Sequence, residues 1–513
     1  MSGYLRRLAT TGAAYTAASI FSKLIAVALL PLYTRYLTLE DYGAAEAMFA
    51  AIVSVSIVVR LGLIEALLRF YYKDGEDPAR VVASSFAALF WLATAAALIA
   101  LPFAKPISEL LLNEPATDLA RIAIGGLWVS TMFEYLLTLF RLEERARAFF
   151  ITTMLSVISA IGLTVILVVG AGEGARGLLL GSYISGAAFV LGLIWVHRRR
   201  LSLRFERPLL RRLLRFGTPT MPAELSLYGL NFVDRIIIIH AIGLPEAGLY
   251  SLGVKFAQAV NVLVRGFQLA WPPLAYSIRD DDEARRTYAT VVTLFTAGCA
   301  FVVTGMWLLS RWIVRALAAP KFFDSYEVIG LIATGVTLYA LYMVLVVILG
   351  RTGRTEFNFP ATIAALVANI ALNLILVPSL GIVGAGIALV ASYIVVLALM
   401  YVFTQRLFPV PYEWARLLRV VGVSTTLVLL GEFLLPTDGF VGLLLRMALW
   451  LLYPFALLAT GFFTRGERAW LARLRRPGVL AAQLRSLRPS TAGVDGSIPE
   501  TYEAEQIDED SRF

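Results

Sequence analysis

The feature that most constrains this chain is a series of apolar runs, each long enough to cross a membrane. A helix needs about 20 consecutive apolar residues to span the hydrocarbon core of a bilayer. Such runs lie near 12–36, 43–68, 81–104, 121–140, 149–171, 176–196, 217–241, 247–272, 288–310, 326–349, 358–378, 383–404, 417–435 and 440–463. Since helices satisfy their own backbone polar groups in lipid, the pattern predicts an all-α polytopic membrane protein with about fourteen transmembrane helices.

Composition argues against a large soluble domain and against catalysis. Hydrophobic residues make up 59% of the chain and charged residues 16%, whereas ordinary globular domains carry about 25% charged residues. The single cysteine, Cys299, permits no disulfide framework, and His197 and His240 lie in different segments. No GxxxxGK[ST] pattern occurs, and the longest outer loop, 105–120, is short. We therefore expect no metal site, no cofactor and no enzymatic activity.

The distribution of Lys and Arg predicts the orientation in the membrane. With the N-terminus inside, only seven of the 45 basic residues fall in outer loops and flanks: Arg35, Lys105, Arg121, Arg176, Arg311, Arg315 and Lys321. Because positive charge collects on the cytoplasmic side, both termini are expected inside. No cleavable signal peptide is evident. The eight-arginine connector 197–215 is expected to lie on the anionic leaflet rather than to bind nucleic acid.

An internal repeat divides the chain. Leu5-Arg6-Arg7-Leu8 reappears 205 residues later as Leu210-Arg211-Arg212-Leu213, and Leu39 and Gly43 match Leu244 and Gly248. This spacing predicts two six-helix lobes in parallel orientation, related by an axis along the membrane normal. We expect an N-lobe at 1–200, a C-lobe at 201–408, two extra helices at 409–465, and a cytoplasmic tail at 466–513 that is amphipathic and then disordered.

Polar residues inside the spans are the candidate site, because each intramembrane charge needs a partner or a watery cavity. They share faces of the spans that would meet between the lobes: Lys23, Arg60, Glu224, Asn231, Asp234, Arg235, Lys255, Gln258, Asn261 and Arg265. The functional interpretation is a water-filled cavity lined by cations. The alternative is that these residues form interhelical salt bridges, for example Asp234 with Lys255.

Two arginines favour the functional interpretation. Arg60 and Arg265 occupy equivalent positions in the repeat, and no acidic residue lies one helical turn from either. Guanidinium groups bind phosphate oxygens in a bidentate fork, so such a cavity suits an anionic substrate. For Glu134, Glu432 and Arg446, a purely structural role is at least as plausible.

Several motifs resemble those of a known family. The stretch from Pro31 to Leu37, with Asp41-Tyr42-Gly43, is similar to the opening of bacterial polysaccharide (O-antigen type) flippases. Asp234-Arg235 and Ala247-Gly248-Leu249-Tyr250-Ser251 are similar to the start of their second lobe. These proteins belong to the multidrug/oligosaccharidyl-lipid/polysaccharide exporter superfamily, and the resemblance extends over the first twelve spans.

The resemblance implies alternating access around a cationic cavity in the bacterial cytoplasmic membrane. The substrate would be a polyprenyl-pyrophosphate-linked oligosaccharide, moved to the outer leaflet for surface polysaccharide synthesis. Lys23, Arg60, Lys255 and Arg265 would bind its pyrophosphate or acidic sugars. A polysaccharide polymerase and a chain-length regulator would be partners beside the membrane lipids. A lipid II flippase, an ion-coupled drug antiporter and a non-transport scaffold for envelope assembly remain alternatives.

Overall fold

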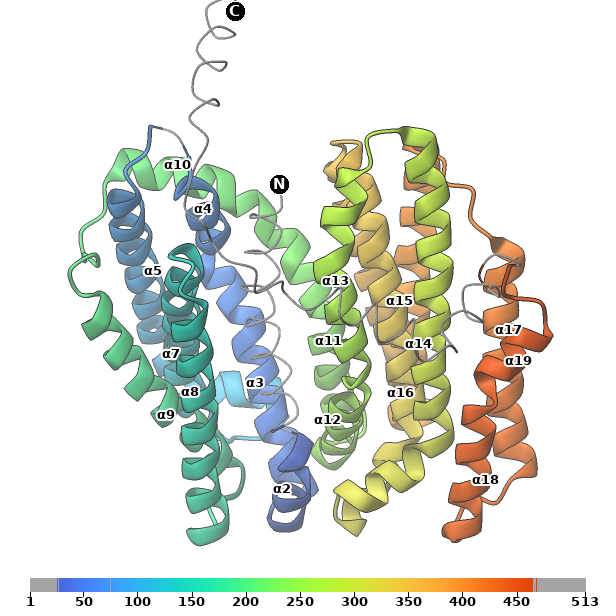
Figure 1. Cartoon of the computed structure of the whole chain (residues 1–513). Coiled ribbons are helices and arrows are strands. Elements are labelled where there is room, and N and C mark those ends of the chain that lie inside the picture. Colours follow the sequence, from blue (N-terminus) through green and yellow to red (C-terminus); the bar gives the residue numbers. More distant parts are fainter. Residues whose placement is uncertain (1–24, 26, 74, 465–466, 468–513) are drawn as a thin grey trace, which may run out of the picture. The chain divides into compact units, whose positions relative to one another are not determined.

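The computed structural model describes residue 25 and residues 27–73, 75–464 and 467 (Figure 1). Every regular element in these ranges is helical. The chain divides into two compact units, 1–456 and 457–513, and the described part of the second contains only the end of the last helix and a following turn. Lys23 and most of the predicted tail lie outside the described residues.

We call the described helices before residue 198 the first lobe. Its elements are α2 (Leu30–Tyr36), α3 (Leu39–Arg60), α4 (Leu63–Phe70), α5 (Pro78–Ala100), η1 (Leu101–Phe103), α6 (Ala104–Leu112), α7 (Thr117–Leu142), α8 (Ala146–Val165), η2 (Ile166–Gly170) and α9 (Gly174–His197). A capping box between Thr38 and Asp41 starts α3. Asp41 also accepts a hydrogen bond from the Ala175 backbone N–H at the start of α9. One carboxylate thus fixes two helix ends.

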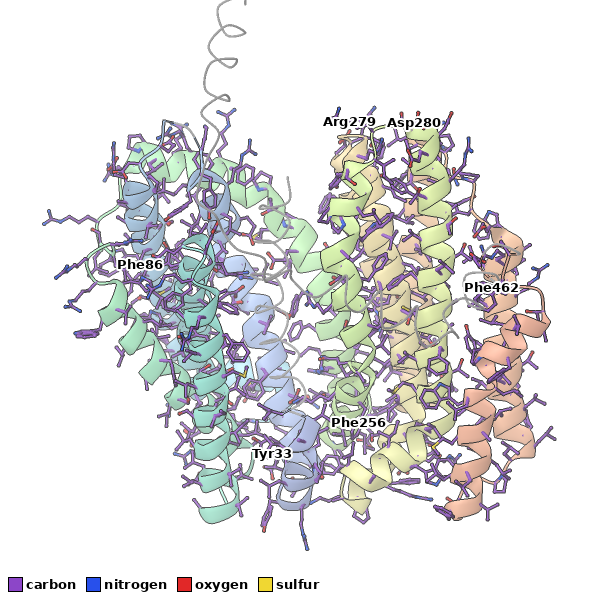
Figure 2. The ribbon with its side chains drawn as sticks, in the orientation of Figure 1. Tyr33, Phe86, Phe256, Arg279, Asp280 and Phe462 are labelled. Atoms are coloured by element: carbon purple, nitrogen blue, oxygen red, sulfur yellow. The ribbon has the colours of Figure 1, made fainter. Side chains whose placement is uncertain are left out.

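The second lobe and the C-terminal helices follow the same helical plan. Their elements are α10 (Arg207–Gly217), η3 (Thr218–Thr220), α11 (Met221–Ala241), α12 (Leu244–Ala257), α13 (Val260–Ser277), α14 (Asp281–Leu317), η4 (Pro320–Ser325), α15 (Tyr326–Arg351), η5 (Thr355–Phe357), α16 (Asn358–Leu407), α17 (Trp414–Leu434), α18 (Gly439–Leu451) and α19 (Tyr453–Ala459). Figure 2 shows Arg279 and Asp280 where α13 meets α14, with Phe256 toward the opposite end of the helices.

Ten helical segments among the described residues are long and apolar enough to cross a membrane. This confirms a multi-pass helical membrane protein, and the count of fourteen stays a prediction. The difference has physical causes. The first run is largely undescribed, and α11 contains three charged residues. The run 247–272 is divided into α12, which has only 14 residues, and α13, which contains several polar residues. The runs 358–378 and 383–404 form the single segment α16, which breaks at Gly381 with φ +60°.

The basic helix α10 packs on the first lobe. Its two buried leucines, Leu209 and Leu213, lie on α4 and α5, and its arginines are exposed. The apolar face therefore contacts protein, where the sequence suggested the leaflet. Arg80 on α5 donates to Glu206 just before α10, and this hydrogen bond holds the pKa of Glu206 below its usual value.

Candidate interlobe site

The two lobes approach most closely at glycines, and one of these contacts joins repeat-related residues. A Cβ on Gly43 of α3 would lie 2.3 Å from the Leu244 carbonyl oxygen, and one on Gly248 of α12 would lie 2.4 Å from the Leu39 carbonyl oxygen. The contact is reciprocal, so the matched pairs meet each other across the interface between α3 and α12 (Figure 1). Only a residue without a side chain permits this distance.

A second glycine contact lies near the other end of α3. The helix ends at Arg60 because Leu61 and Gly62 both adopt left-handed backbone conformations, with φ +48° and +68°. A Cβ on Gly62 would lie 2.0 Å from the carbonyl oxygen of Gly217, which ends α10. The turn after α3 thus rests against the turn that leads into α11.

Arg60 lies beside this second contact, and it is fully paired. Its side chain is buried, with 5% of its surface exposed. Nη1 lies 2.6 Å from Glu134 on α7, and Nη2 donates to Glu224 on α11 over 3.0 Å. The expectation of an unpaired cation at Arg60 was therefore wrong. Both acids come from other helices, so the absence of an acid one turn away on α3 could not reveal them.

The charge around Arg60 also differs from the expected cationic lining. One guanidinium lies between two carboxylates, so the three side chains sum to a net negative charge. Glu134 belongs to the first lobe and Glu224 to the first turn of α11 in the second. Arg60 therefore joins the two lobes electrostatically in this conformation.

Lys255 makes a second ion pair across the lobes. Its ammonium group binds Glu46 on α3 and lies 5.4 Å from the ring centre of Tyr42. This arrangement replaces the suggested pair between Lys255 and Asp234. Glu46 was the missing partner, and its position three residues after Gly43, at the contact with α12, is what places it near Lys255.

Asp234 and Arg235 hold α11 to its neighbours within the second lobe. Asp234 is buried and accepts hydrogen bonds of 2.8 Å from Tyr250 on α12 and from Asn373 on α16. Arg235 donates to Ser251 over 3.1 Å. Two motifs that carry the family resemblance, Asp234-Arg235 and Tyr250-Ser251, therefore bond to each other.

Arg265 lies on a polar face of α13. Asn261 lies on the first turn of the same helix, and Gln258 lies in the turn that joins α12 to α13. Arg265 is exposed, and no ion pair joins it to the described residues. Asn231 lies on α11, one turn before Asp234. Among the described residues, no three His, Cys, Asp or Glu side chains are placed to hold a metal ion.

The pair formed by Arg446 and Glu432 has the structural role that the sequence suggested as an alternative. Arg446 is fully buried, and its Nη1 lies 2.6 Å from Glu432. Its Nε also donates to the Pro436 backbone oxygen. These contacts link α17 and α18, away from α3 and α11.

Solved structures share this fold. The chain aligns with the lipid II flippase MurJ in an inward closed conformation with a TM-score of 0.69, at 15% identity, over 87% of this chain and 97% of that one. An inward-facing multidrug resistance transporter of the MATE family and MOP superfamily aligns with a TM-score of 0.63, at 17% identity, over 75% of this chain and 93% of that one. At these identities, the likeness establishes the fold alone.

The chain is also similar to curated proteins, one of which is named as a transport protein and another as a multidrug resistance protein. The succinoglycan biosynthesis transport protein ExoT of Rhizobium meliloti is 25% identical over 59% of this chain and 61% of its own length. A probable multidrug resistance protein NorM of Bacillus thuringiensis is 26% identical over 37% of this chain and 45% of its own length. The chain thus spans less than two thirds of either relative. A family model described as "polysaccharide biosynthesis protein" matches residues 32–297, which is more than half of the chain. The chain belongs to this polysaccharide biosynthesis family.

Proposed function

We propose that this transporter flips a polyprenyl-pyrophosphate-linked oligosaccharide from the cytoplasmic to the outer leaflet of the bacterial cytoplasmic membrane. The family and the relative named for succinoglycan transport support a glycan substrate. The observation that carries the substrate class is Arg265, an exposed guanidinium on a helix within the second lobe and without an ion pair to the described residues. A lipid-bound diphosphate supplies the oxygen pair that a guanidinium binds best.

In this proposal the diphosphate meets Arg265 first, with Gln258 and Asn261 offering amide hydrogen bonds from the same face. Arg60 and Lys23 would contribute further cations as the lobes rearrange. Lys255, Asp234 and Arg235 are bound to protein groups in this conformation, so their proposed role is to hold the helices that present Arg265. The lipid tail stays in the bilayer, and a polymerase and a chain-length regulator would act on the delivered glycan.

Ion-coupled drug export is a second candidate, and two observations favour it. The chain matches a relative named as a probable multidrug resistance protein over 37% of its length. Asp234 is a fully buried carboxylate, the kind of group that can exchange a cation in a transporter. Ion-gradient-dependent dye efflux from vesicles that contain the purified protein would support this candidate.

Complementation of a deletion strain tests the proposed flippase. The Arg265→Gln variant should reduce surface glycan about tenfold, because one charge-assisted hydrogen bond contributes about 1.5–3 kcal/mol. Arg279→Gln is the matched control, since Arg279 is an exposed arginine in the turn between α13 and α14. Equal glycan display by Arg265→Gln and wild type, at equal protein level, would refute the assignment. A gene neighbourhood of glycosyltransferases and a polymerase would identify the substrate class.

A further inference from the structure

Two carboxylates bind the buried guanidinium of Arg60, one at each terminal nitrogen. Glu134 binds Nη1 and comes from the same lobe as Arg60, whereas Glu224 binds Nη2 and comes from the other lobe. A phosphate group that approaches either nitrogen therefore meets a carboxylate that is already bound there. Only the Glu224 position can be vacated by a movement of one lobe relative to the other.

The equivalent position in the second lobe lacks this arrangement. Arg265 lies 205 residues after Arg60, at the offset that relates Leu39 and Gly43 to Leu244 and Gly248. It is exposed and makes no ion pair with the described residues. One arginine of the matched pair is thus available in this conformation, while the other is neutralised.

We propose that Glu224 is an internal competitor for the diphosphate at Arg60, which keeps that half of the site closed until α11 moves away. This inference rests on the proposed function, because it takes Arg60 to be part of the diphosphate site. Glu224 would be a positioning residue that acts through Arg60, and would not itself bind the substrate.

The burial of the two partners explains why an exchange is favoured over simple separation. The Arg60 side chain is 6% exposed, so water cannot readily replace a carboxylate that leaves Nη2, although Glu134 stays bound at Nη1. The Glu224 side chain is 37% exposed and can be hydrated after it leaves. An incoming diphosphate would therefore replace Glu224 as an anion that compensates the positive charge of Arg60.

The surrounding backbone makes this ion pair responsive to lobe movement. Glu224 follows Pro222 in the first turn of α11, and η3 with Pro219 precedes it. Proline lacks the N–H that would complete a helical hydrogen bond, so this segment bends more easily than a regular helix. On its far side, Gly217 rests against Gly62. Movement of α11 about this segment would separate Glu224 from Arg60.

Binding of a soluble lipid diphosphate to the purified full-length chain tests this inference, with farnesyl diphosphate as the probe. The Glu224→Gln variant should bind it about five- to tenfold more tightly than wild type, because a larger fraction of molecules has Arg60 available. Arg60→Gln should bind more weakly than wild type. Glu432→Gln is the matched control, because it removes a carboxylate from another buried arginine outside the lobe interface, and it should bind as wild type does.

The results separate this inference from the proposed function. If Arg60→Gln weakens binding but Glu224→Gln leaves it unchanged, Glu224 is no competitor and the inference fails while the site stands. If Arg60→Gln binds as wild type does, Arg60 is not part of the site and the proposed function must be revised. Glu224→Asp, which keeps the charge on a shorter side chain, should give an intermediate affinity. It provides a second test of the inference if the glutamine variant fails to fold. A structural defect alone would not increase affinity.

Discussion

At the scale of single residues, the closest packing between the lobes depends on the absence of a side chain at Gly43. A Cβ there would lie 2.3 Å from the Leu244 carbonyl oxygen and 2.9 Å from the Gly248 backbone nitrogen. Both neighbouring atoms belong to the backbone, so they cannot turn aside as a flexible side chain can. Relief requires that α3 and α12 move apart.

Replacement of Gly43 by alanine should therefore destabilise the closed contact by about 1–3 kcal/mol, the usual range for overpacking. Thermal unfolding of the purified protein should show a lowered Tm. Gly125→Ala is the control, because nothing lies within 4 Å of a Cβ at that helical position; there alanine should be neutral or stabilise α7 by up to about 1 kcal/mol. Equal Tm values for the two variants would contradict the tight contact.

The sequence shows which charged residues lie within the spans, but it could not predict how they pair. Arg60 and Glu224 are 164 residues apart, and no spacing rule joins groups on different helices. The proposed pair of Lys255 with Asp234 was wrong for the same reason, since the position of Glu46 depends on helix packing. In contrast, the 205-residue offset that relates Gly43 to Gly248 is visible in the sequence itself, and the structure brings these two glycines to the same contact.

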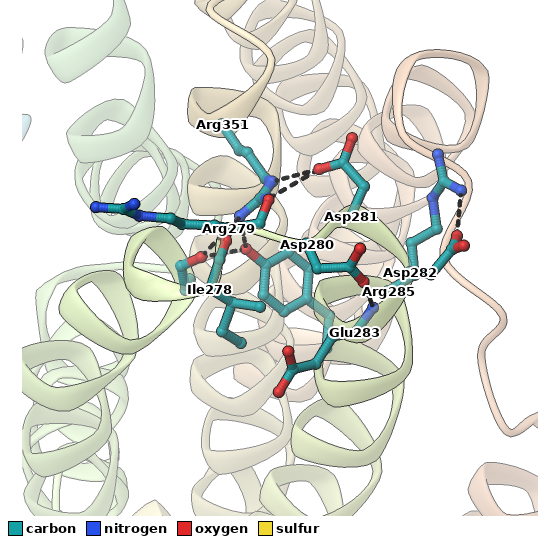
Figure 3. A network of polar contacts seen from close by, with 10 residues as sticks. Ile278, Arg279, Asp280, Asp281, Asp282, Glu283, Arg285 and Arg351 are labelled. Atoms are coloured by element: carbon teal, nitrogen blue, oxygen red, sulfur yellow. Dashed lines mark hydrogen bonds and ion pairs between the residues drawn. The ribbon is translucent and has the colours of Figure 1, made fainter.

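At the scale of elements, Arg351 at the end of α15 fastens the turn between α13 and α14 (Figure 3). Its guanidinium donates to the backbone oxygens of Ile278 and Ala275 over 2.8 and 3.1 Å, and to the Asp281 carboxylate over 2.8 Å. It also donates to the Tyr288 hydroxyl over 3.2 Å. One side chain thus holds the ends of three helices together.

Arg351→Ala should loosen this turn, since several charge-assisted hydrogen bonds are lost together at about 1.5–3 kcal/mol each before compensation by water. Amide hydrogen exchange in residues 278–282 should become at least tenfold faster. Arg354→Ala is the matched control, because the ion pair of Arg354 with Glu356 over 2.8 Å is exposed, and such pairs contribute little; its guanidinium otherwise lies over the Phe357 ring. Unchanged exchange in the Arg351 variant would show that the turn is held by other contacts.

Apolar periodicity predicted most helices but could not resolve three features of their arrangement. The two runs on either side of Gly381 form one element, because the helix continues on both sides of a kink at that glycine. The helical run of α12 and α13 is interrupted at Gln258. Its polar residues also lower its mean hydropathy, so it does not stand out as a membrane span. The apolar face of α10 gave no indication of whether lipid or protein would cover it.

At the scale of the whole molecule, the ion pair between Glu46 and Lys255 joins α3 of the first lobe to α12 of the second. It lies beside the Gly43–Gly248 contact, whereas Arg60 and Glu224 join the lobes near the other end of α3. The two lobes are thus linked electrostatically at two levels. Fold and family could be predicted from the sequence, by span length and motifs. The ion pairs that link the lobes could not, because they depend on how helices far apart in the sequence pack together.

Exchange of the two charges tests whether the Glu46–Lys255 pair holds the lobes together. Glu46→Lys alone places two ammonium groups side by side, and Lys255→Glu alone places two carboxylates there. Either variant should lower stability by about 3–5 kcal/mol, as expected when a buried pair is broken. The double variant restores opposite charges at the same positions. It should therefore be more stable than either single variant, because residues in direct contact are energetically coupled.

The matched control is the exchange of Arg315 and Asp438, an ion pair whose side chains are 41% and 66% exposed. Because water screens exposed pairs, their contribution is about 0–1 kcal/mol, and neither single variant should change the Tm appreciably. Thermal unfolding of the six variants gives both coupling energies. If the double variant of Glu46 and Lys255 is no more stable than the single variants, the two groups act independently, and packing at the glycines alone must hold the lobes at this level.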